Sequence, residues 1–150
     1  MNTKPIKYLP FLFVLLLFLT CCKAQTPEVL VQKKNGDKIS VSVEVMRTKD
    51  ERHLGLMYRK SLKKYRGMLF IFEKEQHQPF TMKNTYIPLD MIFISRTKKI
   101  AGIVENTVPK TKGPYQIQKP SQYVLEVNAG FCRENGIVKG DSVVFERVKR

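Results

Sequence analysis

The sequence is poor in the residues from which metal sites and covalent cross-links are made. It has no tryptophan, two histidines and three cysteines among 150 residues. Cys21 and Cys22 follow an N-terminal apolar run, so Cys132 is the one thiol in the rest of the chain and an internal disulfide there is excluded. Neither His53 nor His77 stands at a close metal-ligand spacing from another strong ligand, which argues against zinc. We therefore expect no metal and no cofactor, and a domain stabilised by packing.

Catalytic signatures are missing as well. Ser61 and Ser95 lack the strand-to-helix elbow of hydrolases, Cys132 has no evident histidine partner, and the glycines form no phosphate-binding loop. The sequence therefore favours a binding or scaffold domain over an enzyme, without identifying an activity.

Acidic residues are scarce, with 13 Asp and Glu against 27 Lys and Arg, and the net charge is +14. It falls to +11 when the three lysines of residues 1–24 are removed. Such a surface could attract anionic lipid headgroups, cell-wall polyanions or nucleic acid. The lysines form no run of five, so a solvated basic surface without a specific partner is the alternative.

The apolar run Phe11–Leu19 is shorter than the roughly 20 residues that a membrane-spanning helix needs. It follows Lys4 and Lys7 and precedes small or polar residues, which is the layout of a secretory signal peptide. We expect residues 1–24 to be this signal, and an uncleaved anchor is the alternative. Because an exported protein is kept away from the nucleoid, we expect no nucleic-acid partner.

Leu19-Thr20-Cys21-Cys22 resembles the bacterial lipobox, in which the last cysteine is lipidated after cleavage. We therefore expect a lipoprotein signal that ends at Cys22, a membrane contact through the lipid, and a periplasmic or outer-membrane location in the cell envelope. Ordinary signal-peptidase cleavage after Ala24 is the alternative.

Residues 25–150 have the pattern of one β-rich domain. The apolar residues of Ile39–Val45 alternate with polar ones, which predicts a strand with one apolar face. The pair Asn35-Gly36 predicts a tight hairpin between this strand and Val29–Gln32. Further strands are expected at Met68–Phe72, Pro79–Lys83, Met91–Ser95, Ile100–Val104, Tyr123–Val127 and Ser142–Val148.

Two short helices complete the prediction. Thr48 and Glu51 have the spacing of a capping box, so a helix should begin there and end at Gly55. A second helix is expected over Ala129–Asn135, closed by Gly136. About eight short strands without long crossover helices predict a compact, mainly antiparallel β-sandwich or barrel.

Three segments together are similar to a known family. They are Glu51-Arg52-His53-Leu54-Gly55-Leu56-Met57-Tyr58-Arg59, Gly67-Met68-Leu69-Phe70-Ile71-Phe72 and Phe80-Thr81-Met82-Lys83-Asn84-Thr85-Tyr86-Ile87-Pro88-Leu89-Asp90. They resemble the bacterial and archaeal family called domain of unknown function 192, and with Val124–Gly130 and Gly136–Asp141 the resemblance covers about residues 39–148. It implies a mostly antiparallel β fold, often behind a signal peptide, with no established activity. Thr81 stands where the family pattern has tryptophan, so an aromatic platform at that position is not expected.

The same segments contain the candidate ligand-binding residues. Lys83-Asn84-Thr85 places a cation, an amide and a hydroxyl in a turn, and Asp90 opens an apolar strand where its charge would need Lys83, Arg52 or Arg59 as partner. The two arginines could grip a carboxylate or phosphate. For a small or anionic ligand or a cell-wall component, the expected residues are Glu51, Arg52, Arg59, Lys83, Asn84, Thr85 and Asp90.

Each of these residues also has a structural alternative. Glu51 is explained by the capping box, Asp90 by an ion pair, and Asn84 and Thr85 by the needs of a tight turn. Arg52 and Arg59 could each close a surface or interface pair with an Asp or Glu. A hydrolase or transferase with Asp90 or Glu51 as base and Lys83 as electrostatic stabiliser is a second functional hypothesis. A third is Cu(I) binding by methionines with Cys132 and a histidine, against methionines that fill the core; these are Met57, Met68, Met82 and Met91.

Overall fold

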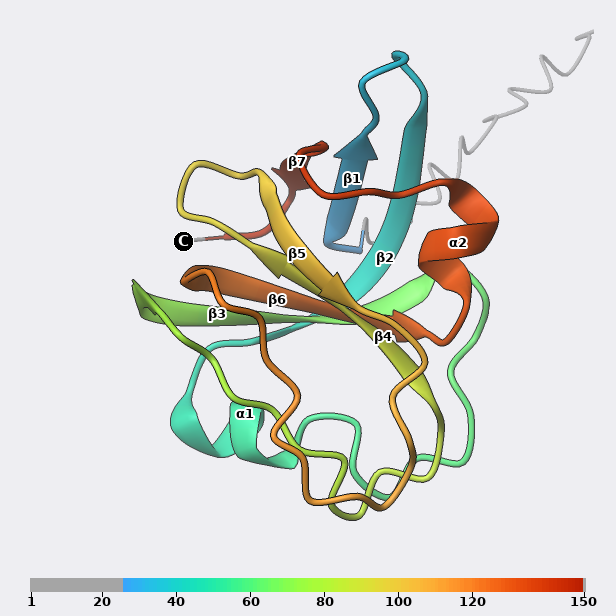
Figure 1. The fold of residues 1–150 in the computed structure, drawn as a ribbon, viewed down its shortest axis with the longest axis vertical. Coiled ribbons are helices and arrows are strands. Elements are labelled where there is room, and N and C mark those ends of the chain that lie inside the picture. Colours follow the sequence, from blue (N-terminus) through green and yellow to red (C-terminus); the bar gives the residue numbers. More distant parts are fainter. Residues whose placement is uncertain (1–25, 150) are drawn as a thin grey trace, which may run out of the picture.

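The computed structural model describes residues 26–149, so the expected signal segment and Cys22 lie outside the described residues. Seven strands and two short helices make up the domain (Figure 1). In chain order they are β1 (Glu28–Gln32), β2 (Lys38–Met46), α1 (Lys49–Leu54), β3 (Arg66–Gln76), β4 (Leu89–Ile94), β5 (Ile100–Val104), β6 (Ser121–Asn128), α2 (Phe131–Asn135) and β7 (Ser142–Glu146).

The strands form one sheet in the order β5-β4-β6-β3-β2-β1-β7. Neighbouring strands are antiparallel except β2 and β3, which are parallel because the chain crosses over through α1 and the loop after it. The sheet curls so that its two edge strands approach each other at one end, where Lys99 next to β5 bridges Ser142 of β7 and the Ile100 N–H donates to the Asp141 carbonyl at 2.9 Å. The predicted mainly-β class is confirmed, as a curled half-barrel sheet.

The prediction of a strand over Pro79–Lys83 was wrong, and this accounts for the eighth expected strand. Only Phe80 of this segment pairs as a strand residue, in an isolated bridge to Tyr115. The segment then turns: the Thr85 N–H donates to the Met82 carbonyl at 3.0 Å, and Asn84 has a φ of 57°. Proline supplies no N–H for a ladder, and a left-handed residue cannot continue a strand.

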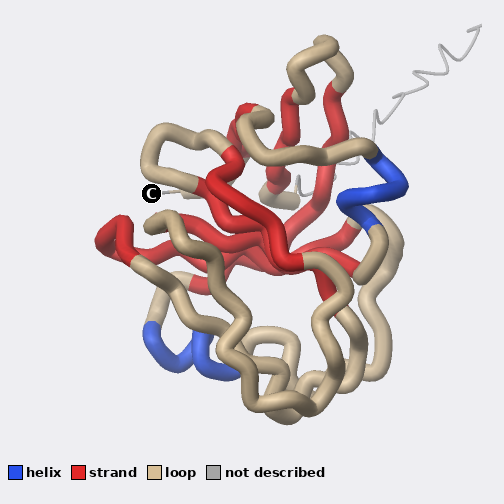
Figure 2. The backbone as a smooth tube through the Cα atoms, viewed as in Figure 1, coloured by secondary structure: helices blue, strands red, loops and turns tan. Residues whose placement is uncertain are grey.

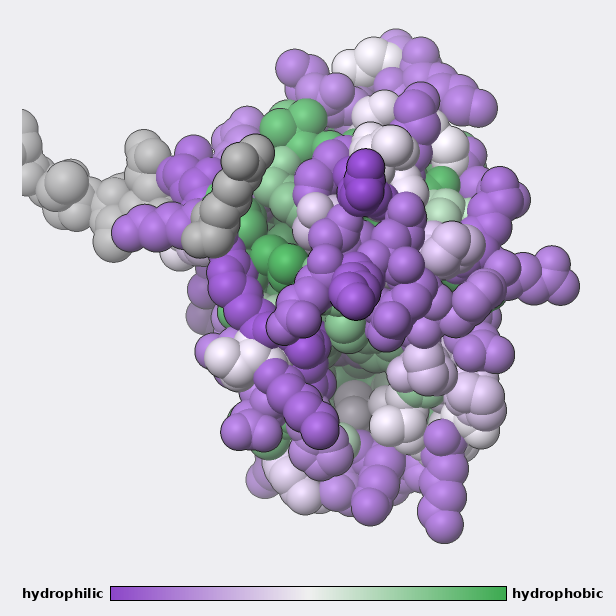
Figure 3. All heavy atoms as spheres, turned by 90° about the vertical axis from the view of Figure 1, so that its left-hand side faces the viewer, coloured by the Kyte–Doolittle hydropathy of each residue, from purple (hydrophilic) through white to green (hydrophobic). Residues whose placement is uncertain are grey.

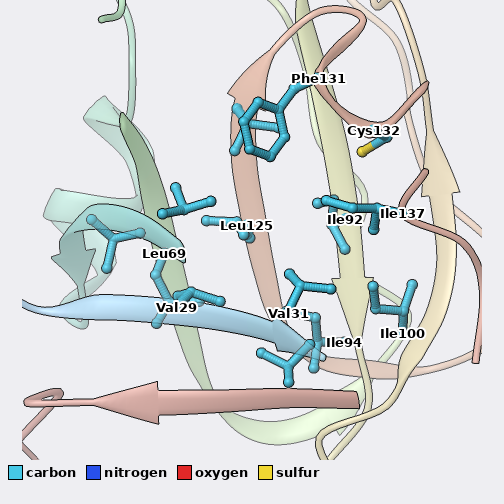
Figure 4. Close-up of a cluster of buried hydrophobic side chains, with 14 residues drawn as sticks. Val29, Val31, Leu69, Ile92, Ile94, Ile100, Leu125, Phe131, Cys132 and Ile137 are labelled. Atoms are coloured by element: carbon cyan, nitrogen blue, oxygen red, sulfur yellow. The ribbon is translucent and has the colours of Figure 1, made fainter. Parts of the chain in front are cut away.

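The first hydrophobic core lies inside the curl of the sheet (Figure 4). The alternating residues Ile39, Val41, Val43 and Val45 of β2 all pack against it, as their period of two predicts. Cys132 from α2 belongs to this core and is fully buried, so burial raises the pKa of its thiol above the ordinary value. Its predicted role as a small packing residue agrees with this position.

The second core lies on the opposite face of β3, β4 and β6. These strands contribute alternate residues, among them Met68, Phe70, Met91, Phe93 and Val124. The cover is made by loops between the strands, which occupy the lower half of Figure 2. An irregular cover in place of a second sheet is why the fold is no sandwich.

Helix α1 begins as its capping box predicts. The Thr48 hydroxyl accepts from the Glu51 N–H at 3.2 Å, and the Glu51 carboxylate accepts from the N–H groups of Thr48 and Arg47 at 2.8 Å each. These hydrogen bonds hold the pKa of Glu51 below its usual value.

No helix within residues 26–149 is long and apolar enough to cross a membrane.

Asp90 ties β4 to helix α2 on the side of the first core. Its fully buried carboxylate accepts three backbone N–H groups, from Asn106 at 2.9 Å, Gly130 at 3.1 Å and Cys132 at 2.9 Å. Gly130 is the N-cap of α2 and has no side chain of its own to cap the helix, so Asp90 provides the cap from the sheet. The cation that we expected beside this carboxylate is replaced by backbone dipoles.

We predict that Asp90→Asn lowers the free energy of unfolding by about 1.5–3 kcal/mol. The amide NH2 group of the new side chain would face a backbone N–H that now donates to a carboxylate oxygen. Urea denaturation measures the change. Asp37→Asn in the exposed β1–β2 hairpin is the matched control and should change stability little. Equal effects of the two substitutions would mean that the cap on α2 does not stabilise the fold.

Candidate functional site

A groove of about 680 Å³ opens beside α1, on the face of the sheet that carries the second core. The side of the molecule shown in Figure 3 is hollowed in its lower half. The groove is lined by residues 49–50 and 52–58 in and after α1, by Phe70 and Phe72 of β3, by 79–81 and 83–85, and by Glu126 of β6. Segments far apart in the sequence therefore meet around one hollow.

Aromatic rings form the apolar part of this lining. Phe80 packs edge-to-face on Phe70 at 5.1 Å and on Phe72 at 6.2 Å between ring centroids. The bridge to Tyr115 holds Phe80 in place, with N–H to carbonyl distances of 2.9 Å in both directions. These rings offer apolar contact to a bound molecule.

Cations stand around the groove. Arg52 from α1 donates to the carbonyl oxygens of Ile71, at 3.0 Å, and of Arg47, and its guanidinium lies 5.0 Å from the centre of the Phe72 ring. Lys49 and Lys83 are exposed at the surface and also line the groove. Together with Arg52 they make this side of the groove attractive to anions.

The turn that contains Lys83 is hydrogen-bonded to the segment after α1. The Asn84 amide donates to the Tyr58 hydroxyl at 2.9 Å, and the Tyr58 N–H donates to the Asn84 carbonyl at 2.8 Å. Thr81, which stands where the family pattern has tryptophan, lines the groove and donates from its hydroxyl to the Thr111 carbonyl at 3.3 Å. Two groove walls are thus joined through polar side chains.

Glu126 comes from the centre of the sheet. Its register partners are Met68 on β3 and Met91 on β4, so its side chain points, like theirs, to the face of the second core. It is 5% exposed, it lines the groove, and none of residues 26–149 hydrogen-bonds its carboxyl group. Loss of hydration raises the pKa of Glu126 to about 8. Sequence analysis missed this residue, although an acid inside the apolar run Val124–Val127 is a usable signal.

The structure brings together four of the seven expected residues. Arg52, Lys83, Asn84 and Thr85 line the groove, whereas Glu51, Arg59 and Asp90 do not. Arg59 instead forms a two-pronged ion pair with Glu44, at 2.6 and 2.7 Å, which lowers the pKa of that carboxyl group. Asp90 points to the opposite face of the sheet, toward α2.

Metal-ligating groups do not cluster in the described part of the chain. No group of three or more His, Cys, Asp or Glu side chains within residues 26–149 could hold a metal ion. Met68, Met82 and Met91 lie in the second core, whereas Cys132 lies in the first, so the thiol and these three thioethers do not meet. The Met82 sulfur lies 3.3 Å from the Thr107 hydroxyl oxygen.

Comparison with known proteins gives a family and a fold. The model of the DUF192 family, described as "Uncharacterized ACR", matches residues 30–145. A solved structure of a candidate transcription regulator from Sinorhizobium meliloti 1021 is 36% identical with a TM-score of 0.77, covering 80% of this chain and 94% of that one. A protein of unknown function from Novosphingobium aromaticivorans DSM 12444 is 35% identical with a TM-score of 0.75, covering 78% of this chain and 83% of that one. No curated protein matches the sequence.

We predict that Glu126 makes the protein less stable as the pH rises from about 5 to 8. In this range the folded Glu126 keeps its proton, whereas the unfolded side chain, with its ordinary pKa near 4.5, has lost it. The folded state therefore binds more protons, and stability falls by up to about 1.4 kcal/mol per pH unit. Urea denaturation across this range should show the decrease in the wild type and lose this component in Glu126→Gln.

The variant isolates this carboxyl group. The lowered pKa values of Asp37, Glu44 and Glu51 place their own stability changes below about pH 4.5, outside the range. Parallel stability curves for the wild type and Glu126→Gln would show that Glu126 titrates normally in the fold.

Proposed function

The chain belongs to the domain-of-unknown-function-192 family, and we propose that it binds a small organic anion in the groove beside α1. One observation carries the proposal: cations from two separate segments, around α1 and around Lys83, meet over a groove with aromatic walls. The volume of about 680 Å³ lies within the usual range of small-molecule sites.

The chemistry of the groove suits an anion that also carries an apolar part. Lys49, Arg52 and Lys83 would attract a carboxylate or phosphate, and Arg52 is already oriented by its backbone contacts. The rings of Phe72 and Phe80 would contact the apolar part. An anionic cell-wall fragment has the same charge and is a ligand of the proposed class.

Binding is a better account than the hydrolase or transferase hypothesis. Of its two suggested bases, Glu51 is engaged in the cap of α1, and Asp90 is fully buried against backbone N–H groups on the other face of the sheet. Neither carboxylate can reach a substrate that lies next to Lys83 in the groove. The Cu(I) hypothesis is weakened because Cys132 lies in the first core, away from Met68, Met82 and Met91 in the second.

We predict that para-ethylbenzoate, an aromatic carboxylate, binds in the groove, and that Lys49→Gln with Lys83→Gln weakens it by about threefold to tenfold. NMR titration of the purified protein measures both the affinity and the residues whose signals shift. Lys34→Gln with Lys38→Gln at the β1–β2 hairpin, at the opposite end of Figure 1, removes the same two charges and should leave the affinity unchanged. Absence of binding, or shifts confined to other surfaces, would contradict the proposal.

We also propose that the protein is exported and attached to a membrane of the cell envelope through a lipid on Cys22. Support comes from the short apolar run after two lysines and from the lipobox-like Leu19-Thr20-Cys21-Cys22. Transcription regulation, the description of the S. meliloti relative, does not suit an exported protein, so we propose no nucleic-acid partner.

We predict that a bacterial host incorporates labelled palmitate into the wild-type chain but not into Cys22→Ser, which should leave the membrane fraction. Cys21→Ser is the matched control and should still be labelled, because the lipobox tolerates small residues before the modified cysteine. An unlabelled wild-type protein whose N-terminus is Gln25 by mass spectrometry would instead establish ordinary cleavage after Ala24.

A further inference from the structure

Glu126 is a buried acid whose carboxyl group stabilises no element of the fold by hydrogen bonding within the described residues. It is 5% exposed between Met68 and Met91, and no group of residues 26–149 hydrogen-bonds its carboxyl group. Asp90 and Asp141, the other two buried acids of the described chain, both accept backbone N–H groups. Leaving a polar group buried and unpaired costs free energy, so an apolar residue would suit the fold better at this position.

The groove gives Glu126 access to a ligand. Its side chain points from the sheet toward the loops that cover the second core, and its small exposed fraction borders the groove. The exposed cations Lys49 and Lys83 also line the groove and are hydrated by solvent. A bound molecule would thus meet mainly positive charge near the surface, from Lys49 and Lys83 against Asp50, and a buried acid further in.

We propose that Glu126 binds a basic nitrogen of the ligand, so that the groove selects small amphoteric molecules with an acidic group at one end and an amine at the other. This inference rests on the proposed anion-binding function and specifies its ligand. The acid of the ligand is drawn to the cations near the surface, which leaves its other end facing Glu126. An ammonium group there supplies the hydrogen-bond donors that the carboxylate lacks.

Binding of an ammonium ligand requires Glu126 to release its proton. In the empty groove at pH 7 Glu126 holds its proton, because burial raises its pKa to about 8. An ammonium ligand keeps its own protons and stabilises the ionised carboxylate, so the proton of Glu126 passes to the buffer. The other charged or titratable side chains of the groove are Lys49, Asp50, Arg52, His53, Tyr58 and Lys83.

Two probes that differ in one group test the inference. Both para-(aminomethyl)benzoate and para-ethylbenzoate carry the same ring and carboxylate, but only the first carries an ammonium group. At pH 8, where ionising Glu126 costs little, the amine probe should bind the wild type about tenfold more tightly. Glu126→Gln should abolish this preference.

Asp50→Asn is the matched control, because it neutralises the other acid of the groove and should keep the preference. Calorimetry at pH 7 in two buffers of different ionisation enthalpy gives the second readout. The wild type should release close to one proton with the amine probe, and Glu126→Gln should release none. Comparison of the two proteins removes any contribution of His53.

The outcomes separate this inference from the function on which it rests. If para-ethylbenzoate binds and the amine probe binds no better, or if the preference survives Glu126→Gln, the role of Glu126 is overturned while anion binding stands. If neither probe shifts groove signals, the proposed function fails and this inference with it. A cooperative unfolding transition of Glu126→Gln, at or above the wild-type melting temperature, shows that the variant is folded.

Discussion

Burial of β4, of the first half of β3 and of most of β6 on both faces is the constraint on which the rest of the architecture depends. Every residue of β4 is buried, and its side chains alternate between the two cores. The curl of the sheet covers one face by itself, but the other face needs a separate cover. The chain supplies it with long loops, and the groove lies where α1 and the loop around Lys83 meet over this face.

Loops can cover a hydrophobic face only when their own polar groups are satisfied. Here side chains accomplish this: Asn84 joins the turn around it to Tyr58, and Thr107 donates to the Leu89 carbonyl while accepting from its N–H. Asp90 does the same on the opposite face, where it gathers N–H groups from α2 and from the loop after β5. Several conspicuous residues of the family pattern, among them Asn84 and Asp90, therefore hold loops against the sheet.

The features that follow from short-range chemistry were predictable from the sequence. The capping box at Thr48 and Glu51 and the Asn35-Gly36 turn depend on neighbouring residues, and the apolar face of β2 depends only on a period of two. The parallel pairing of β2 with β3 and the loop character of Pro79–Lys83 were missed, because both are decided by contacts between distant segments. Apolar residues under a loop cover have the same composition as those of a strand.

Only part of the candidate site was predictable from the sequence, because the rest depends on contacts between distant segments. Lys83, Asn84 and Thr85 were found through the turn chemistry that brings them to the groove, but the partner of Asp90 was wrong because backbone N–H groups leave no mark in a sequence. Glu126 differs from Asp90 although both are acids in apolar strands. Asp90 meets three donors inside the protein, whereas the carboxyl group of Glu126 faces a groove and meets none within residues 26–149. An acid whose burial is compensated supports the fold, whereas one left uncompensated beside a groove costs stability, and a ligand that supplies the missing partner would recover that cost.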